Sequence, residues 1–398
     1  MISNRLNSIP IQTSQPKIAR SVAPKVEQKP NPEPPVSDRV RLQTLQPLDT
    51  PKDSISTLVD DLGYVEFPQV SPDGKTLVFN VVGDYATSQM MRVSSAGGEV
   101  KALESGQTID ADNVGQYLVD HQGSIREQAT WTGDGQHLLY RTNENGTFDI
   151  GQYNLADGSQ SLVAVDPNLN LKHPVQMGDG KIVFYGGPPG EQYPTTDRYS
   201  NLFLVDPISG QKTQLTHSKG EVAYKHPAPI PGGIVAHLED KSREGVSDVI
   251  FLNPESGEQS KLTNTPLADE RHPFYNEKVE LMVYHRKEAG DKNLVLSTPD
   301  GSRSAQLTFY GRPAQSPCWS PDGKKIYFVK KEAKQPEGEP FYVRKADVRV
   351  IDVESALKDL EKQAKKRLKK LKKSDADPEL QKLAQQQLDN YEYFLRRY

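Results

Sequence analysis

The chain has few of the residue types that cross-link small proteins or build common catalytic centres. Its 398 residues include one cysteine, Cys318, so neither an internal disulfide nor a zinc site made from cysteine pairs can form. The place of this cysteine in the run 317–319 is typical of a buried, unreactive thiol. The sequence also has no Gly-x-Ser-x-Gly turn, no phosphate-binding glycine loop and no His-Glu-x-x-His pair. These absences favour a protein without enzymatic activity.

A strong excess of one charge and long apolar runs are missing as well. With 49 Lys and Arg against 53 Asp and Glu, the net charge is −4 at pH 7, which argues against a nucleic-acid-binding surface over the whole molecule. No apolar window approaches a membrane span, and the first residues lack the apolar core of a signal peptide. We therefore expect no nucleic-acid partner, no membrane span and a cytoplasmic location. A periplasmic location, or export by an unconventional route, is the alternative.

What the chain does contain is one turn that recurs between short apolar runs. Proline presets φ at the second position of this turn, and glycine accepts the left-handed backbone that closes it. The sequence Ser-Pro-Asp-Gly stands at 71–74 and 320–323, and eroded copies lie at 132–135, 177–180, 230–233 and 275–278. The pattern predicts six copies of one β-hairpin.

Each turn is followed by a run rich in β-branched and aromatic residues, and most units continue to a second glycine turn and a short edge strand. The glycines of the first turn lie 45 to 61 residues apart, with one double interval of 90. Four strands per unit at this period are typical of β-propellers. We therefore predict an all-β, six-bladed β-propeller over residues 38–353, with insertions at about 104–126 and 186–200.

The segments outside the propeller differ in composition from it. Residues 1–37 are rich in proline and poor in apolar residues, which predicts a disordered arm. The sixth unit lacks an edge strand, and the alternating segment 40–46 could supply it and close the ring. Residues 354–398 show helical spacing broken at 374–378, with Asp377 as a cap and Pro378 in a first turn, so we predict a helical hairpin.

A run of basic residues lies in the first of these helices. Residues 362–373 contain seven lysines and Arg367. The interpretation we prefer is a solvated helix face above buried leucines, because most charge runs are of this kind. A site for an anionic partner is the alternative.

Comparison of the units reveals one constellation of candidate functional residues. The residue before the proline of the first strand is a histidine in three consecutive units: His173, His226 and His272. The innermost strand of a propeller blade lines the central channel, so these imidazoles are predicted to converge there, with Arg271 and Gln176 nearby. A polar ligand, a peptide or a divalent metal could bind such a ring, since neutral imidazole is a common metal ligand. A purely structural role, duplicated with the repeat, is the interpretation to set against these.

With strands and turns assigned, the segments 67–75 and 316–324 resemble the repeat of the TolB-like, WD-like propellers, and the resemblance spans about residues 64–353. It implies a propeller that binds a protein, as the Tol-Pal component binds a peptidoglycan-associated lipoprotein. Similar propellers precede the hydrolase domain of prolyl oligopeptidases. The oligogalacturonate lyases are a further group, whose propeller holds a metal through histidines.

Two hypotheses of function follow. The first is a non-catalytic scaffold, a monomer without cofactor, that binds a protein or peptide partner at the channel mouth. The alternative is a metal-dependent lyase or hydrolase acting on a carbohydrate or polyanionic substrate. In that case His173, His226 and His272 would hold the metal, and Arg271 or Gln176 would orient the substrate.

Overall fold

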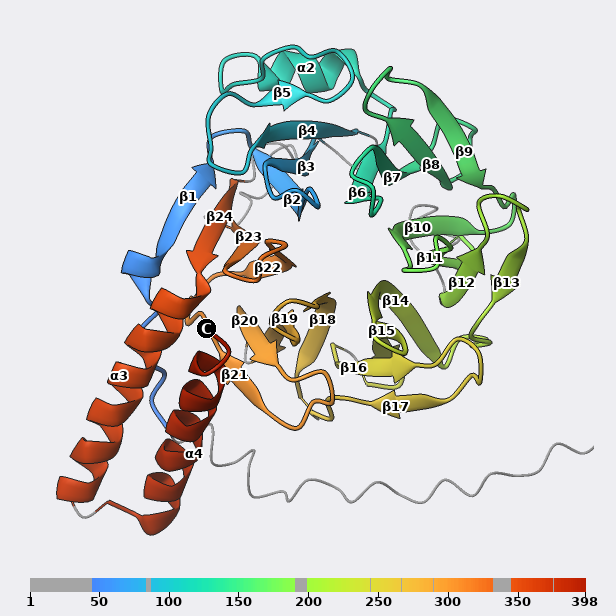
Figure 1. Cartoon of the computed structure of the whole chain (residues 1–398). Helices are drawn as coiled ribbons and strands as arrows, with labels where there is room; N and C mark the ends of the chain where they lie inside the picture. Colours follow the sequence, from blue (N-terminus) through green and yellow to red (C-terminus); the bar gives the residue numbers. More distant parts are fainter. Residues whose placement is uncertain are drawn as a thin grey trace, which may run out of the picture.

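The computed structural model describes residues 45–83, 87–189, 199–243, 245–265, 267–288, 290–331, 345–374 and 376–398, and the predicted arm at 1–37 lies outside them. The described chain forms a ring of antiparallel sheets with a pair of helices at its rim (Figure 1). None of the helices in these ranges is long and apolar enough to cross a membrane.

The strands follow the repeat in chain order, from the innermost strand of a unit outwards (Figure 1). The first three units are β2 (Tyr64–Val70), β3 (Thr76–Val82), β4 (Ser88–Ser94) and β5 (Lys101–Ala102); β6 (Arg126–Trp131), β7 (His137–Thr142), β8 (Asp149–Asn154) and β9 (Gln160–Ala164); and β10 (Asn170–Gln176), β11 (Ile182–Gly187), β12 (Asn201–Val205) and β13 (Lys212–Gln214). The fourth and fifth are β14 (Val222–Ile230), β15 (Gly233–Asp240), β16 (Ser247–Leu252) and β17 (Gln259–Lys261); and β18 (Asp269–Asn276), β19 (Leu281–Glu288), β20 (Asp291–Ser297) and β21 (Ser304–Gln306). The sixth contains β22 (Ala314–Trp319), β23 (Lys325–Lys331) and β24 (Ala346–Asp352), and β1 (Ile55–Val59) completes its sheet.

The expectation of six separate sheets is not met. The structure has four separate four-stranded sheets, while the fourth and fifth units form one sheet of eight strands. They join through a parallel pairing of Ser247 in β16 with Asp269 in β18, where the Ser247 hydroxyl donates a hydrogen bond to the Asp269 carboxylate. A hydroxyl and a carboxylate at facing strand ends thus connect two units that the repeat pattern alone separates.

The recurrent turn has the predicted chemistry. In the first copy the Ser71 hydroxyl donates to Asp73, whose carboxylate also accepts from the Lys75 amide, and Gly74 has a φ of +74°. The eroded copy in the fifth unit is a shorter turn, with Asn276 paired to Leu281 and Glu280 in the left-handed conformation at φ +53°. The Asn276 side-chain oxygen accepts from the amides of two residues inside the turn, Lys278 and Val279.

The closing strand is not the predicted one. β1 (Ile55–Val59) pairs antiparallel with β24, whereas residues 40–44 lie outside the described ranges and Leu45 packs against the C-terminal helices. Every other unit passes from its outer strand to the inner strand of the next unit, the first through a longer insertion and the others through a short connection. Four residues separate β1 from β2, so β1 makes the same kind of short connection.

The C-terminal hairpin was predicted correctly. α3 (Val353–Lys373) begins after Asp352, whose carboxylate accepts from the Ser355 amide. α4 (Pro378–Leu395) begins after Asp377, whose carboxylate accepts from the Glu379 amide. Their apolar faces and the last two units share one core, which includes Leu357, Leu360, Phe328, Leu388 and Tyr391.

One helix was missed. α2 (Val114–Asp120) lies in the insertion between β5 and β6, where the sequence was taken to contain no helix. Its buried residues are Val114, Tyr117 and Leu118. A helix of seven residues offers only this single apolar triplet, which is too short to establish a helical period.

The closure by β1 can be tested with an engineered disulfide between Ser56 and Val350, which lie directly opposite each other. We expect the variant Ser56→Cys with Val350→Cys to oxidise, because paired strands bring Cα atoms within the 4.4 to 6.8 Å, roughly, that a disulfide needs. Linking positions so distant in the chain should stabilise the fold by about 6 kcal/mol in the chain-entropy model. Mass spectrometry and urea unfolding measure the two effects.

The matched control is Gln43→Cys with Val350→Cys, which the alternative closure by residues 40–46 would oxidise. It should stay reduced. Oxidation of the control but not of the first pair would contradict the assignment of β1 as the closing strand.

Candidate binding site on the channel axis

The same backbone irregularity occurs in the innermost strand of every unit. Each of these strands shifts register by one residue against its neighbour, and the residue at the shift has a φ between 47° and 56°. These residues are Phe67, Gln128, His173, His226, His272 and Ser316. Left-handed backbone costs a residue with a side chain about 1 to 2 kcal/mol. This left-handed conformation recurs at equivalent positions in all six units, which shows that the repeat itself produces a β-bulge. A bulge changes the direction in which a side chain points.

The bulges bring the three predicted histidines together. The ring centroid of His226 lies 3.6 Å from that of His272 and 5.0 Å from that of His173. Phe67 reaches the same cluster from the first unit, with its centroid 5.9 Å from His272 and 6.2 Å from His173. Side chains from separate units thus meet on the axis of the ring, as the sequence analysis predicted for the three histidines.

Two further histidines, which the sequence analysis missed, lie behind the first three. His237 on β15 and His285 on β19 are both buried. The Nδ1 atoms of His226 and His237 are 3.0 Å apart, and the rings of His272 and His285 are 5.0 Å apart. A signal for them exists in the sequence, because both histidines lie at equivalent places in the second strands of adjacent units.

The environment keeps these imidazoles uncharged. Burial lowers the pKa of His173 to about 4 and lowers the pKa of His226, His237, His272 and His285 further, and the neighbouring imidazoles add to the effect for His226 and His272. Both ring nitrogens of His272 and one each of His173, His237 and His285 are buried without a hydrogen-bond partner among the described residues. These ring nitrogens could therefore donate or accept further hydrogen bonds that the described protein atoms do not make. Within the described ranges no group of His, Cys, Asp and Glu side chains has an arrangement that could hold a metal ion.

Charged residues occupy the position just before the bulge. On two neighbouring units they are acidic, and on the next three they are basic: Glu66 and Glu127, then Lys172, Lys225 and Arg271. The positive charge of Arg271 acts on its neighbours, since it helps to lower the pKa of Lys225 and of Lys292. The residues beside the histidine cluster are therefore polarised, with one acidic and one basic side.

Most of these charges have partners, which fixes their positions. Arg271 Nε pairs with Asp269, Lys225 Nζ with Glu239, and Arg141 with Glu127. On the acidic side, Glu66 accepts hydrogen bonds from Tyr64 and from Gln315 of the sixth unit. Burial raises the pKa of Glu66, while burial and nearby cations lower the pKa of Lys292 to about 8.

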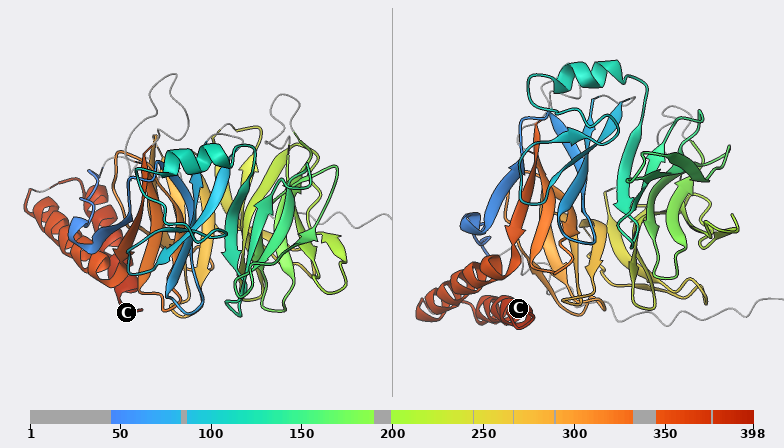
Figure 2. Two further views of the ribbon diagram at one scale, coloured as in Figure 1. Left: turned by 90° about the horizontal axis from the view of Figure 1, so that it is seen from above. Right: turned by 45° about the horizontal axis from the view of Figure 1, so that its top comes forward.

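This polarised ring lies towards the face of the disc on which the innermost strands begin. These strands end at the recurrent turns on the other face. α2 lies on the starting face (Figure 2). Connecting segments on a rigid scaffold commonly carry binding residues. We call this side the channel face.

Gln176 does not join the histidines. It ends β10, beyond the bulge and towards the recurrent turns, and its side-chain oxygen accepts from the Gly133 amide at 2.8 Å. Its role in the structure is a contact between the second and third units. Arg271, by contrast, is adjacent to His272 and lies on the channel face.

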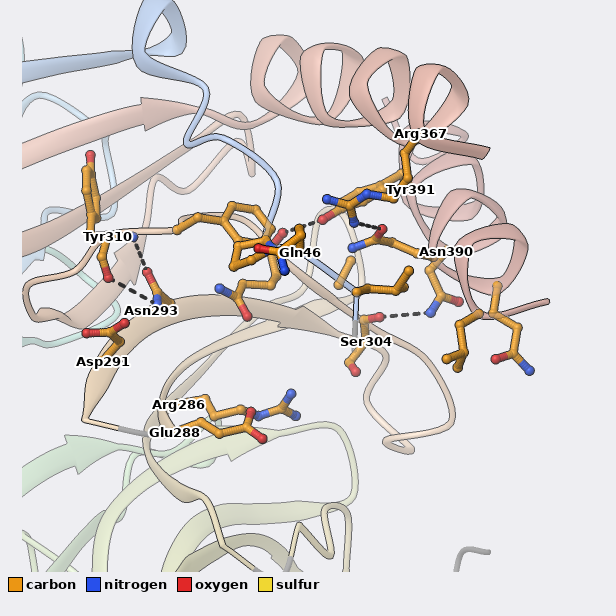
Figure 3. Close-up of a pocket in the computed structure, with 18 of the residues that line it drawn as sticks. Gln46, Arg286, Glu288, Asp291, Asn293, Ser304, Tyr310, Arg367, Asn390 and Tyr391 are labelled. Carbon is orange, nitrogen blue, oxygen red and sulfur yellow. Dashed lines mark hydrogen bonds between the residues drawn. The ribbon is translucent and has the colours of Figure 1, made fainter. Parts of the chain in front are cut away.

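A pocket of about 630 Å³ lies elsewhere, between the hairpin and the fifth unit, and contains none of the predicted site residues (Figure 3). Its polar lining is largely bonded internally: Arg367 donates to Gln387, Asn390 donates to the Ser304 carbonyl, and the Tyr391 hydroxyl donates to the Gln306 carbonyl. The first bond joins the two helices, and the other two anchor α4 to β21 of the ring. The pocket is therefore part of the junction between them.

Comparisons with known proteins identify the fold. No protein-family model matches the sequence, and no curated protein matches it. A putative TolB from Agrobacterium tumefaciens is similar in structure, with 19% identity, a TM-score of 0.50, and 73% of this chain and 90% of that one covered.

Two other solved structures are similar at lower scores. TolB from Acinetobacter baumannii has 13% identity and a TM-score of 0.48, with 73% and 64% of the two chains covered. An oligogalacturonate lyase from Vibrio parahaemolyticus has 14% identity and a TM-score of 0.47, with 75% and 93% covered. Together with the geometry, the likeness to the Agrobacterium protein shows an all-β propeller fold similar to that of TolB.

The buried histidines predict that acid destabilises the fold between about pH 6.5 and pH 4. The pKa of His173 is about 4 in the folded chain, whereas an unfolded histidine titrates near pH 6.5. In this window the unfolded chain binds more protons, so the free energy of unfolding falls as the pH falls, by about 1.4 kcal/mol per pH unit for each such histidine. Urea unfolding across the window measures the slope.

The variant His173→Gln should lower this slope by about 1.4 kcal/mol per pH unit, which is the contribution of one such histidine. Glutamine suits the position, since Gln128 occupies the equivalent bulge with a φ of 56°. His217→Gln, on the exposed connection after β13, is the matched control and should leave the slope unchanged. Equal slopes in His173→Gln and the unmodified protein would show that His173 is not held neutral.

Proposed function

We propose that the chain is a non-catalytic scaffold whose channel face binds a protein or peptide partner, in the manner of a TolB-like, WD-like propeller. On this view the eight-stranded sheet represents two blades, so the ring has six. The observation that carries the proposal is the polarised ring beside the histidine cluster, on the same face as α2. His173, His226, His272 and Arg271 belong to this surface.

The chemistry of the face favours an acidic group on the partner. At the position just before the bulge, three consecutive inner strands offer Lys172, Lys225 and Arg271, whereas the first two units have a glutamate there. A peptide carboxylate would be attracted to the basic side and repelled from Glu66 and Glu127. Ion pairs between partners steer association and fix register more than they add affinity, so the ring suits orientation of an extended peptide.

Gln176 has a smaller part in this proposal. Because its side chain is committed to the Gly133 amide, it supports the contact between two units and through it the position of β10. Its contribution is to the shape of the face and not to direct contact with the partner.

The competing candidate is a metal-dependent lyase or hydrolase acting on a carbohydrate or polyanion. It rests on the convergence of His173, His226 and His272 and on the basic side of the ring. Elemental analysis of the purified protein separates the two candidates. A stoichiometric divalent metal that is lost in His226→Ala would replace the scaffold proposal with this one.

The scaffold proposal is tested by selecting peptides from a random display library on the immobilised protein. Affinity of the selected peptides should fall about tenfold or more in Arg271→Gln, since hydrogen bonds to charged groups contribute about 1.5 to 3 kcal/mol. Fluorescence anisotropy with a labelled peptide measures the change. Higher salt should weaken binding as well, because the interaction is electrostatic.

The matched control is Arg92→Gln. Arg92 is exposed near the end of β4, on the opposite face beside the recurrent turns. This variant should bind the same peptides with unchanged affinity. Peptides that lose affinity for Arg92→Gln but keep it for Arg271→Gln would bind the opposite face, which would contradict this proposal.

A further inference from the structure

α3 has two faces of opposite character. Its apolar residues recur every three or four positions and are buried in the core shared with α4 and the ring: Leu357, Leu360, Ala364 and Leu368. The lysines of the second half of the helix are all exposed on the opposite face: Lys362, Lys365, Lys366, Lys369, Lys370, Lys372 and Lys373. Because the apolar side is buried in the core, the exposed residues of 362–373 on this helix are all lysines.

The charge on this face is concentrated and largely unneutralised. Residues 362–373 carry eight positive charges and no acidic residue, in a chain whose net charge is −4. Of the seven lysines, Lys365 pairs with Glu361 and Glu392, whereas the other six have no ion pair within the described residues. Like charges three and four positions apart on a helix repel each other by a few tenths of a kcal/mol per pair, roughly. An anionic partner would relieve this repulsion.

The shape of the face is a straight, convex row. Lys362, Lys366, Lys369 and Lys373 are spaced by four, three and four positions, which aligns them along the helix over about 16 Å at a rise of 1.5 Å per residue. The hairpin projects from the rim of the ring, and its loop end lies farthest from the sheets (Figure 1). A row on a projecting helix suits a flat surface better than a ligand that needs a groove.

The residue types distinguish between anionic partners. Proteins that read duplex bases combine arginine or lysine on guanine with asparagine or glutamine on adenine, and those that bind single strands stack bases on aromatic rings. Residues 362–373 have no aromatic residue, and their one arginine, Arg367, is bonded to Gln387 on α4. Clusters of four to eight lysines on an amphipathic helix are typical of binding to anionic lipid headgroups, at about 1 kcal/mol per lysine.

We propose that this lysine face of α3 is a docking surface for a lipid bilayer that carries anionic headgroups. The contact is electrostatic and lies on the bilayer surface, because no apolar residue of the helix is available for insertion. The remainder of the chain is net negative and is repelled by the same surface, so the hairpin is the part that faces it. This docking is independent of whatever the channel face binds.

The experiment measures flotation of the full-length chain with vesicles of phosphatidylcholine alone and of phosphatidylcholine mixed with phosphatidylserine. Binding is expected only to the mixed vesicles and should weaken as salt is raised. Replacing Lys362, Lys366, Lys369 and Lys373 by glutamine should lower the partition coefficient by roughly a hundredfold to a thousandfold. Replacing the same four by arginine should preserve binding, which separates the loss of charge from any effect on folding.

A second variant with the same change of net charge is the control. Lys75, Lys219, Lys278 and Lys324 are exposed and lie outside the hairpin. Their replacement by glutamine should leave vesicle binding unchanged. Equal loss in both glutamine variants, equal binding to both kinds of vesicle, or no binding to either would overturn the proposal. So would tighter binding to a DNA duplex, lost in the α3 variant, which would assign the face to nucleic acid.

Discussion

The antiparallel ladder between β1 and β24 is the contact on which the geometry of the molecule depends. It joins the N-terminal side of the described chain to the last sheet and so brings the first unit beside the sixth. Only then can Gln315 of β22 donate to Glu66 of β2, and only then can Phe67 reach the imidazoles of the third and fifth units. A ring left open at this point would separate both the acidic side of the channel face and the stacked cluster on the axis.

Closure imposes a second constraint, because six inner strands converge on one axis. The bulge in each strand directs one side chain into that limited volume, and burial there removes water from the imidazoles. Neutral histidines tolerate this better than charged residues, and several of their nitrogens are left without a described partner. The lysines and arginine just before the bulges stay near the channel face, where carboxylates such as Glu239 and Asp269 can pair with them. The polarised ring is thus the layer beside the buried cluster in which ion pairs stabilise charged side chains.

Local chemistry decided which parts of the fold could be predicted. The turn at Ser71 and its copy at Ser320 are determined by four adjacent residues, so their shape and the strands beside them followed from sequence. The histidines of the first strand converged as predicted because the repeat gives them equivalent places. The prediction of the closing strand was wrong because residues 40–46 alternate more regularly than residues 55–59, whereas the pairing of β1 with β24 depends on tertiary contacts that the local pattern does not show. His237 and His285 face the cluster through tertiary packing, which the first-strand alignment did not include.

The junction between the hairpin and the ring has a consequence for how the two surfaces work together. α3 starts directly after β24 with no linker, and α4 is tied to β21 through the Tyr391 hydroxyl and the Asn390 amide. The shared apolar core, which includes Leu360 and Phe328, leaves the hairpin little freedom to rotate against the sheets. A contact made along α3 therefore fixes the orientation of the whole ring, including the channel face. Because the two surfaces lie on different elements, a ligand on one does not block the other, and their relative orientation is set by the fold.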